Sequence, residues 1–373
     1  MDRKNDVRLK RAVSILDNVL YVGYMEKTVK KFSLYKYSLF EIAVIKEMLQ
    51  TLKNNVSEEE LLRTLKRKLI INIQNDVTIK ENAPIDASFE NSYARILEVL
   101  EFLHNNGAIG NLESEEDQDY STWKYCEAVH NLPLNEIKEI TNKKVAIVGC
   151  GAIGSNVALS LARMGIKRFL LIDIDIVEKG NISRQTYTHK ECKMFKCGAL
   201  KNQLEAINPE ISVSIEYNRV MEENIDAIFM HLSKAKVDFI CWSIDTPVDI
   251  DKKAIRANIP FELPIIFGGF KEYMGYVGPC FDTDDFENWV LWNKAKDPIE
   301  KYVNRVDPLS EKKPTFYHSH KECKQVSYYP LVMQVSGYIA DAIYSYLLNG
   351  KNKLKGVMYA INSIYNTKTN IKL

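Results

Sequence analysis

The chain has 373 residues, which is long enough for two or three domains, and its 46% hydrophobic and 27% charged residues are typical of a globular protein with a substantial core. A net charge of +1 gives no bulk electrostatic reason to expect a nucleic acid or a membrane surface as a partner. No apolar run is long enough to span a bilayer and the N-terminus is too charged for a secretory signal, so we expect a cytoplasmic protein.

The first 112 residues are predicted to form a small α+β domain like a winged helix. Residues 20–34 mix aromatic and β-branched residues and predict a hairpin pair, whereas residues 39–52, 57–69 and 92–110 have the apolar spacing of helices. Ser57 is the expected N-cap of the second helix, and the polar residues 75–91 are expected to form a loop.

Residues 113–142 begin with an acidic, polar stretch and are predicted to be a linker with an entry helix. From residue 143 to 373, apolar strands alternate with helices, which predicts an α/β domain with a Rossmann-like, mostly parallel sheet covered on both faces. A long helix over residues 329–350 and a terminal hairpin over 357–373 complete this domain.

A glycine-rich turn follows the first strand of the second domain. Gly149, Gly151 and Gly154 form a GxGxxG pattern between that strand and the next helix, and Asp173 ends the following strand. Such glycines allow a tight turn and close backbone approach to phosphates at a helix N-terminus, while the acid is placed for a ribose hydroxyl. The alternative is a tight strand–helix turn with a capping aspartate, but the combination favours a nucleotide site.

Polar residues beyond the second strand indicate which class of nucleotide the site binds. Four of them lie in one loop: Asp175, Asn181, Arg184 and Gln185. Lys196 follows this loop, before the next helix. A nicotinamide site needs little beyond the acid, whereas a triphosphate needs cations as pyrophosphate leaves. Asp245, at the tip of a later strand, is a candidate Mg²⁺ ligand. The simpler readings are a solvated loop for the cations and a helix N-cap for Asp245.

These motifs together resemble the ThiF/MoeB/E1 family of adenylating enzymes. The resemblance rests on GCGAIGSN, then DIDIVEKGNISRQ, a downstream lysine and SIDTP, in that order, and covers about residues 143–373. It implies ATP with Mg²⁺, attack of a carboxylate on the α-phosphate, and a homodimer. By position it implies that Asp173 holds the ribose, that Arg184, Gln185 and Lys196 contact phosphates, and that Asp245 holds the metal.

Within the family, the closest resemblance is to the microcin C maturation (MccB-like) enzymes of ribosomal peptide biosynthesis. WSIDTP, AIRANIPF and IIFGGFKEYMGYVGP carry it, and the N-terminal module resembles the recognition element that clamps precursor peptides. The implied partner is a small ribosomally made precursor peptide, bound as an added strand at the hairpin edge. The alternative is a dimerisation or stabilising domain.

The sequence departs from the family pattern in three places. The segment DQDYSTWKYCEAVH lacks the arginine that relatives carry before the first strand, and Lys124 is the nearest replacement. None of the seven cysteines forms a CxxC pair, so no structural zinc is expected. The segment ECKMFKC before the family lysine is one residue shorter than usual and lacks its glycine, which makes Lys196 a less secure match than Arg184.

Cys323 lies in the polar loop YHSHKECKQVSYYP, where thioester- or persulfide-forming relatives often carry a cysteine. Basic neighbours such as His318 and His320 would lower its pKa, but the favoured reading is a loop cysteine with chance basic neighbours. The aromatic segment 286–308 is a candidate lid, although Trp289 and Trp292 also suit the core face of a short helix.

Four functions follow from these patterns. The leading one is ATP-dependent activation of a carboxylate on a small ribosomal peptide, giving a stable nucleotidyl peptide or a cyclised product. The second is activation of a ubiquitin-like sulfur carrier, with Cys323 as acyl acceptor. The others are an NAD-dependent oxidoreductase and a non-catalytic scaffold. The peptide, its reacting carboxylate and the choice between ATP and CTP stay open at this point.

Overall fold

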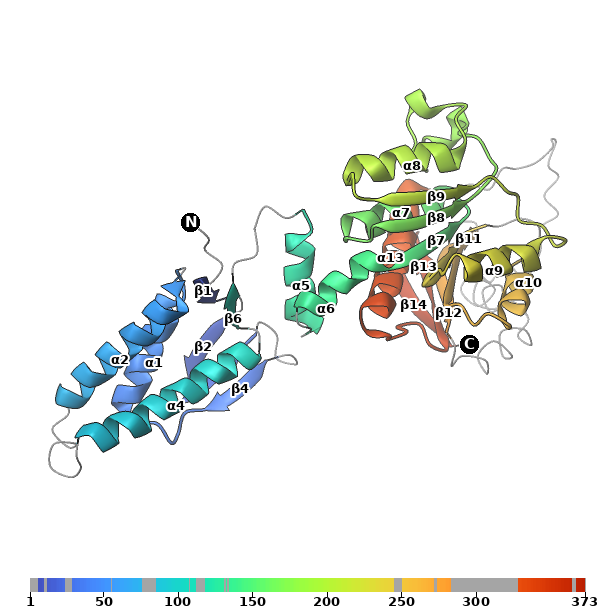
Figure 1. Ribbon diagram of the computed structural model, residues 1–373. Helices are drawn as coiled ribbons and strands as arrows, with labels where there is room; N and C mark the ends of the chain where they lie inside the picture. The colour runs from blue at the N-terminus through green and yellow to red at the C-terminus, as the bar shows by residue number, and fades with distance from the viewer. Residues whose placement is uncertain are drawn as a thin grey trace. The chain divides into compact units, whose positions relative to one another are not determined.

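The computed structural model describes residues 6–9, 12–23, 29–54, 56–75, 85–106, 108–111, 118–130, 132, 134–244, 250–271, 274–282, 328–363 and 367–372. The chain divides into two compact units, Met1–Ile137 and Lys138–Leu373, and Figure 1 labels most of their helices and strands.

The first unit combines two small antiparallel sheets with helices. Its elements, in chain order, are β1 (Asp6–Leu9), β2 (Val13–Leu16), β3 (Val19–Val22), β4 (Lys30–Ser33), α1 (Leu39–Thr51), β5 (Val56–Ser57), α2 (Glu58–Asn75), α4 (Ile85–Asn105), β6 (Ile109–Asn111) and α5 (Tyr120–His130). The strand orders are β2-β3-β4 and β5-β1-β6. The predicted hairpin is therefore present, as the β3–β4 pair of a three-stranded sheet.

Two helices of this unit, α1 and α2, begin at serine residues that cap them. The Ser38 Oγ accepts from the Glu41 N–H at the start of α1, and the Glu41 carboxylate accepts from the Ser38 N–H at 2.7 Å, which completes a capping box. Ser57 caps α2 by accepting from the Glu60 N–H at 3.2 Å, as predicted. Apolar faces of α1, α2 and α4 then close over one buried core, which includes Ile45 and Leu65.

The prediction of a loop over residues 75–91 was wrong in its second half, because α4 already begins at Ile85. Proline at position 84 stands directly before this helix, a placement that favours helix initiation. Phe89 and Tyr93, one turn apart, stack with ring centroids 5.6 Å apart. Glu90 and Asn91 are exposed on this helix, and exposed polar residues of a helix resemble those of a loop in composition.

The second unit is built on one eight-stranded sheet. Its elements, in chain order, are β7 (Lys144–Val148), α7 (Ala152–Arg163), β8 (Arg168–Ile172), α8 (Lys196–Ile207), β9 (Ser212–Glu216), α9 (Ile225–Lys234), β10 (Phe239–Trp242), α10 (Ile250–Asn258), β11 (Ile265–Lys271), β12 (Met274–Phe281), α13 (Tyr329–Asn349), β13 (Val357–Asn362) and β14 (Thr367–Lys372). The short helix α6 (Leu134–Lys138) leads into this unit.

The strand order is β14-β13-β12-β11-β10-β7-β8-β9. Strands β9, β8, β7, β10 and β11 pair in parallel, and β12, β13 and β14 continue the sheet in antiparallel fashion. This confirms the predicted fold class, including the terminal hairpin. The strand order reverses direction between β7 and β10, and in such open sheets ligands bind beyond the carboxyl ends of the strands at that point.

Helices cover both faces of the sheet (Figure 1). One face of the parallel strands packs into a core with α9 and α10, in which Phe229 and Trp242 stack with centroids 5.8 Å apart. On the other face α7 packs against α13, and a side chain at Gly275 of β12 would meet Val335 of α13. Because both faces are covered, chemistry is confined to the loops at the strand ends.

Candidate functional site

A pocket of about 400 Å³ lies at the carboxyl ends of the parallel strands, and we call it the carboxyl-edge pocket. Residues that follow β7, β8, β9 and β10 line it, together with the start of α8. They are Gly149, Gly151, Ile172, Asp173, Ile174, Asp175, Lys196, Asn218, Arg219, Val220, Met221, Ser243 and Ile244. The pocket thus joins the glycine turn to both acids and the lysine predicted from sequence.

The glycines of the turn differ in what they permit. Gly149 has φ +92°, and a Cβ there would lie 2.7 Å from Ile244. A Cβ at Gly154 would overlap the Gly149 carbonyl oxygen, so this glycine allows α7 to pack close to the turn. Gly151 is the N-cap of α7 and has open space where a Cβ would stand. An anion above Gly151 would meet the free N–H groups of the helix start.

Asp173 holds the glycine turn in place. Its Oδ2 accepts from the Cys150 N–H and its Oδ1 from the Asp175 N–H, both at 2.7 Å. Burial raises the pKa of the Asp173 carboxyl, against the opposing effect of the nearby Lys196 ammonium. The carboxylate therefore fixes the path of two loops at the wall of the pocket that it lines.

Lys196 and Arg219 meet at one carboxylate. The Lys196 Nζ lies 2.9 Å from the Asp175 Oδ2, and the Arg219 Nη2 lies 3.8 Å from the Asp175 Oδ1. The Lys196 side chain is 10% exposed and the Arg219 side chain 69%. The pocket therefore has one buried cation in a defined position and one exposed cation that is loosely held.

Tyr187 ties the glycine turn to the start of α8, a connection that the sequence did not reveal. Its buried hydroxyl donates to the Cys150 carbonyl at 2.7 Å and lies 3.3 Å from the Lys196 carbonyl oxygen. Burial raises the pKa of the Tyr187 phenol, which keeps it protonated and able to donate. Beside it, the Cys150 and Cys197 Sγ atoms lie 3.6 Å apart as free thiols. The only sequence signal was a tyrosine two residues after Gln185.

Four predicted residues do not line the carboxyl-edge pocket. Gly154 lies in α7, and the Asn181 Oδ1 accepts from the Glu178 N–H at 2.9 Å within its own turn. The Arg184 guanidinium donates to the Gly180 carbonyl at 2.7 Å. Gln185 is buried, with an Oε1 that has no partner among the described residues. These side chains shape the loop around the pocket in this conformation.

Several predicted residues lie outside the described residues: Asp245, Cys323, His318, His320 and the candidate lid with Trp289 and Trp292. Ser243 and Ile244, which precede Asp245, do line the pocket. Lys124, the candidate replacement for the family arginine, lies in α5, where its Nζ contacts the Glu127 carboxylate at 2.8 Å. Within the described part of the chain, no three His, Cys, Asp or Glu side chains gather as a metal site would require. None of the helices described has both the length and the apolar character needed to cross a bilayer.

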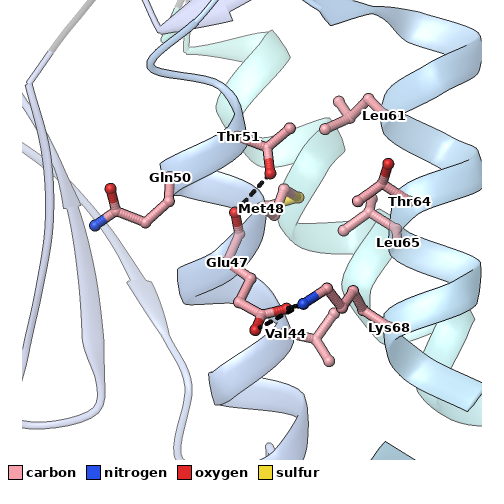
Figure 2. Close-up of a pocket in the computed structure, with 9 residues that line it drawn as sticks. All are labelled: Val44, Glu47, Met48, Gln50, Thr51, Leu61, Thr64, Leu65 and Lys68. Atoms are coloured by element: carbon pink, nitrogen blue, oxygen red, sulfur yellow. Dashed lines mark hydrogen bonds and ion pairs between the residues drawn. The ribbon is translucent and has the colours of Figure 1, made fainter. Parts of the chain in front are cut away.

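The first unit has a smaller hollow of about 220 Å³ between α1 and α2 (Figure 2). Its floor consists of core residues, among them Met48 and Leu65, and the Lys68 Nζ reaches the Glu47 carboxylate at 3.2 Å across its rim. This hollow combines apolar packing with one exposed ion pair, and it offers no group suited to chemistry. The carboxyl-edge pocket is therefore the candidate site.

Comparisons with known proteins agree with this geometry. The model of the ThiF family matches residues 125–373, more than half of the chain. Ubiquitin-like modifier-activating enzyme 5 of Caenorhabditis elegans is 31% identical over 118 residues, which cover 30% of this chain and 28% of that protein. The protein of the same name from Drosophila mojavensis is 34% identical over 103 residues, or 27% and 26%. This chain therefore spans less than a third of the length of these relatives.

Solved structures extend the likeness to the whole chain. The crystal structure of E. coli MccB with ATP has 19% identity and a TM-score of 0.62, covering 98% of this chain and 96% of that chain. The structure of the microcin C7 biosynthetic enzyme MccB in complex with N-formylated MccA has 18% identity, a TM-score of 0.62 and the same coverage. PaaA has 16% identity and a TM-score of 0.67, covering 97% and 98%. At these identities the likeness shows the fold of both units. The family match over residues 125–373 establishes that the chain belongs to the ThiF family.

Proposed function

We propose that this protein uses ATP to activate a carboxylate of a small ribosomally made peptide. The observation that carries the proposal is the carboxyl-edge pocket, in which the glycine turn, Asp173 and the buried Lys196 line one space at the switch point of the sheet. In the proposed reaction a carboxylate oxygen attacks the α-phosphorus of ATP and the bond to the β-phosphate oxygen breaks. Pyrophosphate leaves, and an acyl-adenylate remains.

The residues of the pocket fit a nucleoside triphosphate. Gly151 leaves the N-terminus of α7 uncovered for phosphate oxygens, and Asp173 lies at the end of β8 where a ribose hydroxyl is expected. Lys196 is a buried cation already paired with a carboxylate, and a phosphate group can replace that partner. Asp175 would release Lys196 to the nucleotide and stay at the pocket wall.

The remaining assignments belong to the same proposal. Arg184 would turn from the Gly180 carbonyl toward the phosphates, with Asn181 and Gln185 shaping the loop that carries it. Mg²⁺ suits the carboxylates available, and Asp245 together with phosphate oxygens would hold it. When bound, this ion would offset negative charge on the phosphates. Asp175, whose side chain is 52% exposed, is the carboxylate among the described residues placed to assist.

The first unit supports a peptide as the substrate. Strand β4 lies at the edge of the β2-β3-β4 sheet, so an extended peptide could pair with it. The Phe32 ring of β4 lies 5.0 Å from the Phe102 ring of α4, which places a helix beside this edge. An edge strand flanked by a helix is the arrangement in which backbone pairing gives affinity and side-chain pockets give specificity. One of the two MccB structures named above is a complex with N-formylated MccA.

The experiment uses the purified protein, ATP·Mg and a short peptide encoded beside its gene. Pyrophosphate release or exchange reports activation, and the mass of the recovered peptide reports the fate of the acyl group. A stable nucleotidyl peptide adds a nucleotide, whereas a cyclised product loses water. Unmodified peptide with no pyrophosphate release would contradict the proposal and favour a non-catalytic scaffold.

Two variants separate this function from oxidoreductase chemistry. Arg184→Ala and Asp245→Ala should each suppress ATP–pyrophosphate exchange by about 10²-fold or more, because the first removes a cation from the reacting phosphates and the second removes a ligand of the Mg²⁺ ion. Arg163→Ala is the matched control, since Arg163 is exposed at the end of α7 and away from the pocket. Binding of NADH, together with unchanged activity in Arg184→Ala, would refute the proposal.

A second candidate is activation of a ubiquitin-like protein. It is favoured by the 31% identity with ubiquitin-like modifier-activating enzyme 5 over 118 residues. This function predicts that a ubiquitin-like protein with a free C-terminal carboxylate stimulates pyrophosphate exchange. It also predicts that Cys323→Ala abolishes a thioester product while leaving the exchange intact. Stimulation by the short peptide alone would exclude it.

A further inference from the structure

We propose that Arg219 is a nucleotide-binding residue that covers the base, and this inference rests on the proposed function. Arg219 belongs to no sequence motif that we identified, but it lines the carboxyl-edge pocket from the loop that follows β9. Within the part of the chain that the structure describes, its guanidinium makes a distant ionic contact, to the Asp175 carboxylate at 3.8 Å.

The order of strands indicates which end of the nucleotide Arg219 meets. Along the sheet the order is β7, β8, β9, and these strands lead to the glycine turn, to Asp173 and to Arg219 respectively. Phosphates sit at the helix start beside the glycine turn, and the ribose sits at the acid that follows the next strand. The loop after β9 therefore lies on the side of the ribose away from the phosphates, which is where the base belongs.

The neighbours of Arg219 suit a base rather than a phosphate. Val220 and Met221, which follow it in the same loop, line the pocket with apolar surface, and Ile174 contributes to the same lining. An aromatic base needs such surface and gains from a planar cation over its face. A guanidinium stacks in this way better than an ammonium does, because it is flat and weakly hydrated.

The two cations at Asp175 thus have separate tasks. Lys196 is 10% exposed, starts α8 and shares the carboxylate at 2.9 Å, so it is positioned in advance for a phosphate. Arg219 is 69% exposed and loosely held, so it is free to fold over a base once a nucleotide has entered. Asp175 keeps both near the pocket before binding.

The test compares ATP·Mg with adenosine as probes. Calorimetry measures ATP binding and ligand-detected NMR measures adenosine binding to the wild type, Arg219→Ala, Arg219→Lys and Lys196→Ala. Arg219→Ala should weaken both ligands by the same factor, about three- to thirtyfold, and Arg219→Lys should restore only part of the loss. Lys196→Ala should weaken ATP and leave adenosine unchanged. Arg256→Ala, an exposed arginine outside the pocket, should bind both probes as the wild type does.

Each other result decides against the inference. If Arg219→Ala loses affinity for ATP but not for adenosine, Arg219 is a phosphate ligand. If Arg219→Ala binds both probes as the wild type does, Arg219 does not belong to the nucleotide site. In either case the proposed function stands, because the wild type binds ATP. A wild-type protein that binds neither probe would instead overturn the proposed function, and this inference with it.

Discussion

The Tyr187 hydroxyl donates to the Cys150 carbonyl at 2.7 Å and so joins the loop after β8 to the glycine turn after β7. The same hydroxyl contacts the Lys196 carbonyl at 3.3 Å. One buried side chain thereby sets the spacing between the turn proposed to hold phosphates and the lysine proposed to contact them. The substitutions below separate the contribution of this connection to stability from its contribution to binding.

Tyr187→Phe removes the hydroxyl and leaves the Cys150 carbonyl without that donor inside the protein. Because an unpaired buried acceptor is costly, we expect the free energy of unfolding to fall by about 1–3 kcal/mol, measured by urea denaturation. ATP affinity should fall as well, since the glycine turn loses its tie to α8. Tyr329→Phe, on the half-exposed start of α13, is the control and should change neither quantity. Wild-type stability and affinity in Tyr187→Phe would show that the hydrogen bond is dispensable.

Gly151→Ala and Gly154→Ala should have opposite consequences. A Cβ at Gly154 would overlap the Gly149 carbonyl oxygen, so this variant should lose stability at the upper end of the about 1–3 kcal/mol that overpacking costs. A Cβ at Gly151 meets nothing within 4 Å, so that variant should unfold as the wild type does. It should still bind ATP more weakly, because its methyl group occupies the space above the helix start where a phosphate would sit. Melting temperatures measured with and without ATP separate the two effects. If ATP raises the melting temperature of Gly151→Ala as much as that of the wild type, the result would count against a phosphate site at Gly151.

The titration of Asp173 should appear in the pH dependence of stability. Burial raises the pKa of its carboxyl above the ordinary value of 3.8, so the folded state retains a proton that the unfolded state has already released. Between 3.8 and the raised pKa, the contribution of this group to stability therefore decreases as pH rises. Residue 173 does not titrate in Asp173→Asn. The unfolding free energy of the wild type should therefore fall relative to that of the variant as pH rises through this window, and the difference between the two should stay constant above it. Urea denaturation of both proteins from about pH 3 to pH 7 measures it, and a difference that moves the other way would be inconsistent with the buried carboxyl.

Four cysteines of the second unit should differ in reactivity. Cys150, Cys197 and Cys241 are buried, whereas Cys192 is partly exposed. The hydrogen bond with Cys197 and burial raise the pKa of the Cys150 thiol, and burial raises the pKa of Cys241 to about 12. Iodoacetamide should therefore label Cys192 in the native protein and spare the other three, which become reactive in urea. Peptide mass mapping gives the answer for each cysteine. Labelling of Cys150 as fast as Cys192 would mean that the glycine turn opens readily.

The sequence predicted the elements whose signals are local. The glycine turn, Asp173 and Lys196 follow directly from strand ends and helix starts, and the structure brings them to one pocket. Strand alternation likewise predicted the parallel part of the sheet, because buried strands are apolar throughout.

Contacts between distant loops could not be predicted in this way. Tyr187 reaches Cys150 across 37 positions of the chain, and nothing in a lone tyrosine indicates that contact. Arg219 faces Asp175 only because β9 lies beside β8. The early start of α4 was missed for a different reason, since an exposed helix face and a loop have similar polar residues.

The most direct measurement of the central claim is a crystal structure of the protein with Mg²⁺ and a non-hydrolysable ATP analogue. We expect a triphosphate over Gly151 at the start of α7, a ribose against Asp173, and the Lys196 Nζ transferred from Asp175 to a phosphate oxygen. An empty carboxyl-edge pocket at saturating analogue, or a nicotinamide dinucleotide bound there in preference, would contradict it.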